Sequence, residues 1–241
     1  MKTALITGTN RGIGLELVRQ LLDEGWRVHA TARDPGEQGD QQNPGISTEL
    51  TKLAELHPDT LQRHALDLAD PTAITALSRE LADESVDWLI HNAGIYGPNG
   101  VAFGNVDDVD AWLDVFRINS IAPLLVMQAF AEQVARSGER KIGVLSSKVG
   151  SMGDNGSGGG YIYRSSKAAV NAVIKSASID LEPLGINVAA LHPGWVLTDM
   201  GGPNAEITAA ESAAGLRHIM AELTEADRGR FIDIDGSTIP W

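Results

Sequence analysis

Short apolar segments alternate along this chain with longer segments of helical periodicity, and this alternation strongly constrains the fold. The apolar segments occupy residues 3–7, 27–32, 61–66, 86–91, 141–146 and 186–191, with a weaker one at 230–234. Most lack polar alternation, as strands covered on both faces do. The helical segments between them are 12–24, 48–56, 71–83, 108–136, 161–182 and 207–223. We therefore predict an α/β fold, a doubly wound parallel sheet with helices on both faces.

The boundaries of these segments carry start and loop signals. Pro71 follows Asp70 where a helix is expected to begin, and proline is favoured at the first helical position. Residues 34–47 are rich in Gly, Gln, Asp, Asn and Pro, which is typical of a surface loop. Neither a linker nor an internal repeat divides the sequence, so we predict a single domain over residues 1–241.

Composition excludes several classes of function. The chain has no cysteine, which excludes disulfides, thiolate metal sites and cysteine nucleophiles, and we predict no metal site. Its net charge of −13 argues against nucleic-acid partners and anionic membranes, since both select clustered Lys and Arg. No uninterrupted apolar stretch reaches about 18 residues, and the N-terminal apolar run is too short for a signal peptide. We expect a cytoplasmic protein that does not span a membrane.

A glycine-rich turn follows the first predicted strand and opens a helix. Its glycines, Gly8, Gly12 and Gly14, have the spacing GxxxGxG. Glycines let a backbone turn tightly and approach a pyrophosphate, whose charge is favoured at a helix N-terminus. In parallel α/β sheets, ligands bind beyond the carboxyl ends of the strands, where the strand order reverses. The turn therefore predicts a Rossmann-type dinucleotide site.

The end of the second predicted strand favours NADP(H) over NAD(H). An NAD site usually has an acidic residue about 20 residues beyond the glycines, on the ribose hydroxyls. Here Ala32 stands at that position and Arg33 follows it. Arg33 and Arg11 are suited to pair with a 2′-phosphate from two sides, although either arginine alone is typical of a solvated surface charge. Asp34, one residue further on, is the feature that weakens this prediction.

Tyr163 and Lys167 lie four residues apart in a predicted helix, so they share one face. A free phenol has a pKa near 10, and a neighbouring ammonium is expected to lower it toward the range of acid–base catalysis. The pair alone would equally suit an ordinary helix surface. Its context favours a catalytic role, because several polar segments are predicted at the same edge of the sheet.

Those segments lie after the third to sixth predicted strands or in the helix before the fifth. Ser146 and Ser147 end the fifth strand, where a hydroxyl can bind a substrate carbonyl oxygen. Asn119 lies in the preceding helix, where a buried amide needs partners. The remaining candidates are Asp67 after the third strand, as an adenine contact or a capping residue, Asn92-Ala93-Gly94 after the fourth, and Pro193-Gly194-Trp195-Val196-Leu197-Thr198 after the sixth.

Over essentially its whole length, the chain resembles the short-chain dehydrogenase/reductase family. The resemblance rests on motifs that occur in the family's order: Thr-Gly-xxx-Gly-x-Gly, Asn-Ala-Gly, the helix Asn, the strand-end Ser, Tyr-xxx-Lys and Pro-Gly-x-Val-x-Thr. Residues 159–167 and 231–241 are similar, more narrowly, to C-factor and sniffer-type carbonyl reductases. The resemblance implies that Tyr163 transfers the proton, Lys167 tunes Tyr163 and binds the nicotinamide ribose, and Asn119 holds a water in a proton relay. It implies Ser147 as the catalytic serine, with Ser146 and Ser151 as alternatives, because the segment before Tyr163 is longer than in most members. The implied cofactor contacts are Gly8, Asn10, Arg11, Gly12, Ile13, Gly14, Arg33, Asp67, Leu68, Asn92, Ala93, Gly94, Tyr163, Lys167, Pro193, Gly194, Val196 and Thr198.

These features predict an oxidoreductase that transfers a hydride between NADP(H) and a small carbonyl or alcohol substrate. The alternative is a nucleotide-binding signalling protein of C-factor type without essential turnover, although such a protein has no need of the complete Ser, Tyr, Lys and Asn set. Residues 194–207 suggest a mobile lid, and Tyr96 and Met152 add to an apolar pocket, while burial in the core is the ordinary role of such side chains. His91 stands where the family more often has Asn, a departure that concerns packing of the sheet. The helices at 108–136 and 161–182 are candidates to pair in a homo-oligomer, as in relatives.

Overall fold

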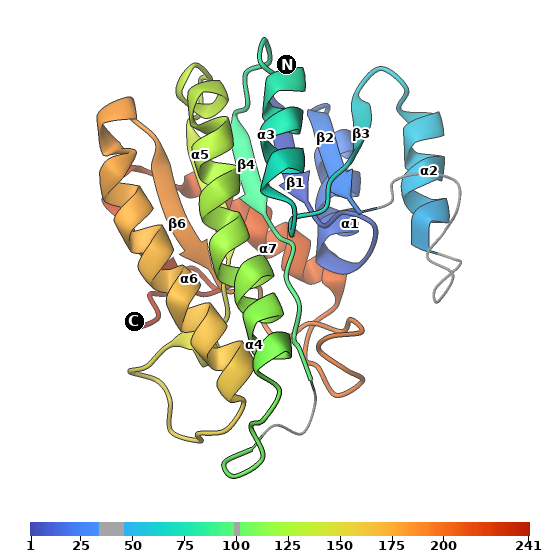
Figure 1. Ribbon diagram of the computed structural model, residues 1–241. Helices are drawn as coiled ribbons and strands as arrows, with labels where there is room; N and C mark the ends of the chain where they lie inside the picture. Colours follow the sequence, from blue (N-terminus) through green and yellow to red (C-terminus); the bar gives the residue numbers. More distant parts are fainter. Residues whose placement is uncertain (34–45, 99–101) are drawn as a thin grey trace.

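Seven parallel strands form one sheet in the computed structural model, which describes residues 1–33, 46–98 and 102–241. The order across the sheet is β3-β2-β1-β4-β5-β6-β7, and it reverses direction between β1 and β4 (Figure 1). Ligands of open α/β sheets bind at such a reversal. The strands are β1 (Thr3–Thr7), β2 (Arg27–Ala32), β3 (Leu61–Ala65), β4 (Trp88–His91), β5 (Lys141–Leu145), β6 (Asn187–Leu191) and β7 (Phe231–Ile232).

Helices cover both faces of the sheet. α1 (Gly12–Asp23), α2 (Ile46–Leu56) and α7 (Ala209–Glu222) contribute to one apolar cluster, and α3 (Pro71–Glu80), α5 (Ala122–Ala135) and α6 (Tyr161–Asp180) contribute to the other. Side chains alternate along β1, with Ala4 and Ile6 in the first cluster and Leu5 in the second. Burial on both faces explains why the strands are continuously apolar. The predicted Rossmann-type architecture is confirmed.

The predicted helix over residues 108–136 extends from Val109 to Ala135, but it is not α-helical throughout. It consists of α4 (Val109–Phe116), a π-helical turn (Arg117–Ile121) and α5. At the end of the turn, the backbone N–H of Ala122 donates to the carbonyl of Arg117, five residues back. Pro123 follows and has no N–H with which to continue an α-helical ladder. The predicted helix is present, and the sequence analysis did not foresee its π-helical turn.

Other predicted boundaries lie close to the observed ones. Asp70 caps α3, since its Oδ1 accepts a 2.8 Å hydrogen bond from the N–H of Thr72. The loop predicted over residues 34–47 ends too late, because α2 begins at Ile46. The rest of that loop, residues 34–45, lies outside the described residues.

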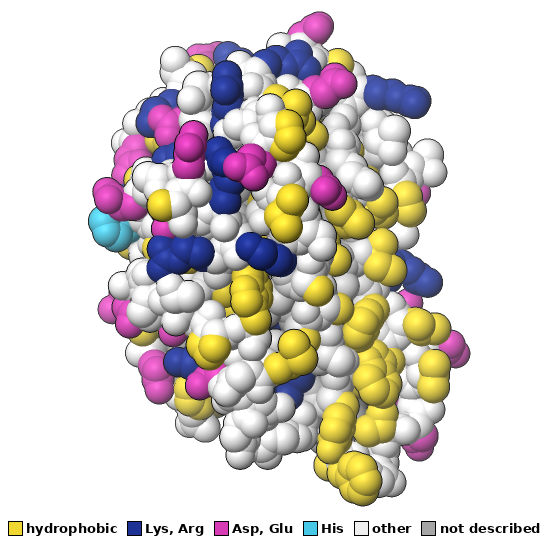
Figure 2. Space-filling model, turned by 90° about the vertical axis from the view of Figure 1, so that its left-hand side faces the viewer, with side chains coloured by type: hydrophobic (Ala, Val, Ile, Leu, Met, Phe, Trp, Pro, Cys, Tyr) yellow, Lys and Arg dark blue, Asp and Glu magenta, His cyan; other side chains and the backbone are white. Residues whose placement is uncertain are grey.

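The stretch Val109–Ala135 is long and apolar enough to cross a membrane by length and composition alone. Helices of a protein core pass the same test, and Val126 and Phe130 of this stretch are fully buried against the sheet. At its other end, Val109, Leu113 and Ile121 are exposed. Figure 2 shows apolar side chains gathered at the lower right of the face that it presents.

Candidate active site

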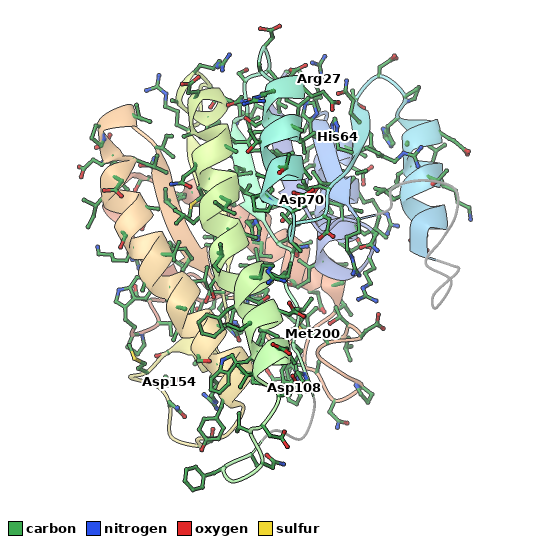
Figure 3. The ribbon with its side chains drawn as sticks, in the orientation of Figure 1. Arg27, His64, Asp70, Asp108, Asp154 and Met200 are labelled. Atoms are coloured by element: carbon green, nitrogen blue, oxygen red, sulfur yellow. The ribbon has the colours of Figure 1, made fainter. Side chains whose placement is uncertain are left out.

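A cleft of about 940 Å³ opens at the edge of the sheet where the strands end. Figure 3 places Met200, which lines the cleft, toward this lower end of the molecule, and Arg27, which starts β2, at the opposite end. The cleft brings together most of the predicted cofactor residues: Gly8, Asn10, Arg11, Gly12, Ile13, Arg33, Asp67, Leu68, Asn92, Ala93, Gly94, Tyr163, Lys167, Pro193 and Thr198. Gly14, Gly194 and Val196, also predicted, are not among its lining residues.

The glycine-rich turn is shaped by close backbone packing. Gly8 has φ +71°, a conformation that favours glycine. A Cβ on Gly14 would lie 2.1 Å from the carbonyl oxygen of Gly8 and 2.6 Å from Nδ2 of Asn92. Gly14 thus acts by packing the start of α1 against the turn, which leaves the turn's backbone facing the cleft.

Asn92 and Thr7 hold this turn in place. Nδ2 of Asn92 donates to the carbonyls of Thr7 at 3.0 Å and Gly8 at 2.8 Å. The fully buried hydroxyl of Thr7 accepts from the backbone N–H groups of Asn92 and Ala93 at 3.1 and 3.2 Å. The sequence identified Asn92 but not Thr7, whose position at the last residue of β1 was the available signal.

Two arginines and two carboxylates lie at the outer part of the cleft. Arg33 is exposed at the end of β2. Arg11 forms a 2.8 Å ion pair with Asp199, in the segment that follows β6. Asp67 accepts a 2.9 Å hydrogen bond from the N–H of Ala69, so it makes a turn and also lines the cleft. Asp34 lies outside the described residues.

The segment after β6 forms the wall of the cleft that faces the glycine turn. A Cβ on Gly12 would lie 3.3 Å from Cγ2 of Thr198, so the two segments nearly touch. Gly194 has φ +82°, and a Cβ there would lie 2.6 Å from Cδ1 of Ile207. Gly194 therefore shapes this segment, and Thr198 faces the glycine turn.

Tyr163 lines the inner end of the cleft, and the side chain of Ser147 interacts with its hydroxyl. Gly150 makes this approach possible, because a Cβ there would lie 2.6 Å from Cβ of Lys167. The segment after β5 thus packs directly on α6. Nζ of Lys167 donates to the carbonyl of Leu145 at 2.9 Å and lies 5.7 Å from the centre of the Tyr163 ring.

Burial controls the acidities of this pair. It raises the pKa of Tyr163 to about 12, opposed by the hydrogen bond with Ser147 and reinforced by Tyr96. Burial also lowers the pKa of Lys167 to about 8. The pKa of Tyr163 is therefore raised, not lowered as expected, because loss of solvation is the largest influence on it. Tyr163 keeps its proton at neutral pH and is suited to donate it.

The geometry distinguishes Ser147 from the two alternative serines. Ser146 is buried, and its hydroxyl donates to Oδ1 of Asn171 on α6 at 2.5 Å. Ser151 is also buried, and its hydroxyl donates to the carbonyl of Pro240 at 2.5 Å. The hydroxyls of Ser146 and Ser151 are thus engaged in hydrogen bonds within the fold. Ser147, which contacts Tyr163, fits the catalytic role.

Asn119 lies in the π-helical turn and is buried. Its side chain clamps the backbone of Ile95, accepting from the N–H at 2.9 Å and donating to the carbonyl at 2.8 Å. It also donates to the hydroxyl of Ser166 at 3.0 Å. These contacts supply the partners that a buried amide needs, and the predicted water relay stays a prediction.

His91 ends β4 and is fully enclosed. Neither ring nitrogen has a hydrogen-bond partner in the described residues. Burial, together with the nearby charge of Lys167, lowers the pKa of His91 to about 3. The imidazole is thus neutral and packs in the sheet beneath the site, as expected from the sequence.

Sequence analysis did not predict several residues that line the cleft. Asp114, Arg117 and Ile118 come from α4 and the π-helical turn, and Ile95 and Leu145 come from segments after strands or at their ends. The helix residues had no signal, because their contact with the cleft depends on how α4 lies across the sheet edge.

The sheet is doubly wound, and the glycine-rich turn lies where its strand order reverses. Together with the Ser, Tyr and Lys side chains beside this turn's cleft, it defines an oxidoreductase that uses a nicotinamide cofactor. Residues 2–209 match the short chain dehydrogenase family, and the chain belongs to that family. It is therefore an oxidoreductase with a Rossmann-type fold, and carbonyl reductases are among its structural neighbours.

Individual relatives agree with this assignment. The chain is 40% identical to C-signal of Myxococcus xanthus over 166 residues, which are 69% of this chain and 99% of that protein. It superposes on the carbonyl reductase Sniffer of D. melanogaster with a TM-score of 0.89 at 32% identity, covering 100% of both chains. It superposes on the NADPH-bound carbonyl reductase from chicken fatty liver with a TM-score of 0.88 at 34% identity, covering 100% of this chain and 94% of that one.

Proposed function

We propose that the protein is an NADPH-dependent carbonyl reductase that acts on a small aldehyde or ketone. The observation that carries the proposal is Tyr163 at the inner end of a cleft that begins at the glycine turn, with Lys167 buried beside its ring and Ser147 interacting with its hydroxyl. The relatives described as carbonyl reductases support the same reaction.

The residues of the cleft fit NADP(H). The glycine turn presents its backbone to the cleft because Gly14 packs closely behind it, and Arg33 supplies positive charge at the outer end, together with Arg11, which pairs with Asp199. The adjacent carboxylate that would favour NAD is replaced by Ala32. NADPH, when bound, supplies the hydride to the carbonyl carbon.

The protein supplies the proton and holds the carbonyl. Ser147 and Tyr163 both present hydroxyls, and these bind the carbonyl oxygen while negative charge develops on it. A pKa of about 12 keeps Tyr163 protonated at neutral pH, and an alkoxide is basic enough to take that proton. The ammonium of Lys167 stabilises the phenolate left behind. Water is kept from Lys167, which is 4% exposed.

The test is NADPH and NADH consumption with a panel of aldehydes, diketones, quinones and aromatic ketones, for the wild type and Tyr163→Phe. We expect NADPH-selective turnover that the substitution reduces by at least about 10³-fold, with unchanged NADPH affinity. Turnover retained in Tyr163→Phe would refute the proton-donor role.

A second candidate function is nucleotide-dependent signalling, favoured by the 40% identity to C-signal. It predicts tight NADPH binding with no turnover that depends on Tyr163 across the panel. The same measurements therefore separate the two functions.

A further inference from the structure

We propose that Tyr96 is a positioning residue for Tyr163, an inference that rests on the proposed carbonyl reduction. The two phenol rings stack with their centres 4.7 Å apart and their planes inclined by 29°. Stacked rings at this separation attract each other beyond the burial of their area. Tyr96 thus fixes the plane in which the Tyr163 hydroxyl meets Ser147.

The backbone on both sides of Tyr96 is held in place. Asn119 bonds both the N–H and the carbonyl of Ile95, the residue before it. Gly97, the residue after it, has φ +84°, and a Cβ there would lie 2.8 Å from Cγ2 of Val115 and 3.4 Å from Cγ2 of Ile162. The loop that carries Tyr96 is therefore pinned against α4 and α6, and its ring has a defined position.

The stack also links two parts of the site that the sequence separates. Tyr96 follows β4, beyond the Asn92-Ala93-Gly94 segment, and Tyr163 lies in the first turn of α6. Asn119 connects them a second time, because Nδ2 donates to the hydroxyl of Ser166, which in turn donates to the carbonyl of Tyr163 at 2.8 Å. Tyr96 remains 43% exposed, so its ring covers Tyr163 without being part of the core.

Tyr96 also affects the acidity of Tyr163, because two neighbouring phenols oppose each other's ionisation. It contributes to the raised pKa of Tyr163, which keeps the phenol protonated. Removing only the hydroxyl and removing the whole ring are therefore different perturbations, and two variants separate them. Tyr96→Phe keeps the stack, and Tyr96→Leu removes it.

Proton NMR with labelled tyrosine tests the stack without any turnover. The chain has three tyrosines, so Tyr161→Phe leaves only Tyr96 and Tyr163, and adding Tyr96→Phe leaves Tyr163 alone. We expect upfield ring-current shifts of the Tyr163 ring protons in the Phe variant and their loss in the matching Leu variant. Equal shifts in the two variants would overturn the stack.

Steady-state kinetics with a substrate from the panel tests the consequence. We expect Tyr96→Leu to lower kcat by about 2-fold to 12-fold, with an unchanged NADPH dissociation constant, and Tyr96→Phe to restore most of kcat. A Leu variant with wild-type kcat, or a Phe variant as slow as Leu, would refute positioning by the ring. Failure of the wild type to turn over any substrate would refute the proposed function, and the NMR shifts would still report on the stack.

Discussion

Lowering the pH from about 7.5 to about 5 is expected to reduce the free energy of unfolding by about 4 kcal/mol, because two buried histidines stay neutral in the folded protein. Burial lowers the pKa of His91 to about 3 and that of His29 to about 4, from an ordinary value of 6.5. Below that ordinary value the unfolded chain binds protons that the folded protein does not. The stability is present above pH 6.5 and is lost as the pH falls toward the folded pKa values.

The magnitude follows from proton linkage. At about pH 5 each histidine is mostly protonated in the unfolded chain and mostly neutral in the fold, which costs about 2 kcal/mol for each. His29 also has a neighbour that opposes its protonation, since its Nδ1 lies 3.0 Å from Nε2 of His64. Paired carboxyls such as Glu139 have pKa values below the ordinary 4.5, so they contribute only at lower pH.

Urea unfolding at a series of pH values, followed by the fluorescence of the five tryptophans, measures this loss. His91→Asn should reduce it by about 2 kcal/mol, because the contribution of His91 is removed. His218→Asn, at an exposed position on α7, is the matched control and should leave the pH dependence unchanged. A stability that is flat between about pH 5 and 6.5, or a slope that His91→Asn does not alter, would refute the reasoning.

Four further substitutions test the site and the fold. Ser147→Ala should lower kcat by about 10²-fold to 10³-fold, because it removes a donor to the oxyanion. Ser146→Ala should mainly lower the free energy of unfolding, by about 1–3 kcal/mol, because it leaves Oδ1 of Asn171 unpaired. Similar losses of kcat in the two variants would contradict the assignment of Ser147. Arg33→Ala should weaken NADPH binding about 10-fold to 100-fold in fluorescence titrations, with little change for NADH, and equal losses would show that Arg33 does not contact the 2′-phosphate. Gly14→Ala should abolish NADPH binding, because its Cβ would lie 2.1 Å from a carbonyl oxygen; a variant that binds normally would contradict the tight packing of the turn.

The sheet could be predicted from sequence because its strands are buried on both faces. Segments such as residues 3–7 and 27–32 are apolar throughout, and the structure places strands over the same residues. β7 is shorter than its predicted segment, at two residues, because only Phe231 and Ile232 pair with β6. Apolar periodicity gave no sign of the π-helical turn, and the one available signal was Pro123 in the interior of the predicted helix.

The site was predictable only as a set of segments. Strand ends meet at one edge of a parallel sheet, so Tyr163, Lys167 and the glycine turn were expected together, and the cleft contains them. The choice between Ser146 and Ser147 depends on which hydroxyl points to Asn171 and which to Tyr163, and this is a property of three-dimensional packing. The direction of the pKa shift of Tyr163 was missed because burial cannot be read from the spacing of Tyr and Lys. A cytoplasmic location and a homo-oligomer stay predictions.

The π-helical turn sets a rotational phase between two halves of one long helix. An α-helix advances by about 100° for each residue, so deleting one residue from Arg117–Ile121 would close the turn into regular helix and rotate α4 relative to α5 by about that angle. Asn119 would then leave Ile95, although the apolar face of α5 would still fit the sheet. The extra residue is thus a spacer that lets one helix serve the core at one end and the active site at the other.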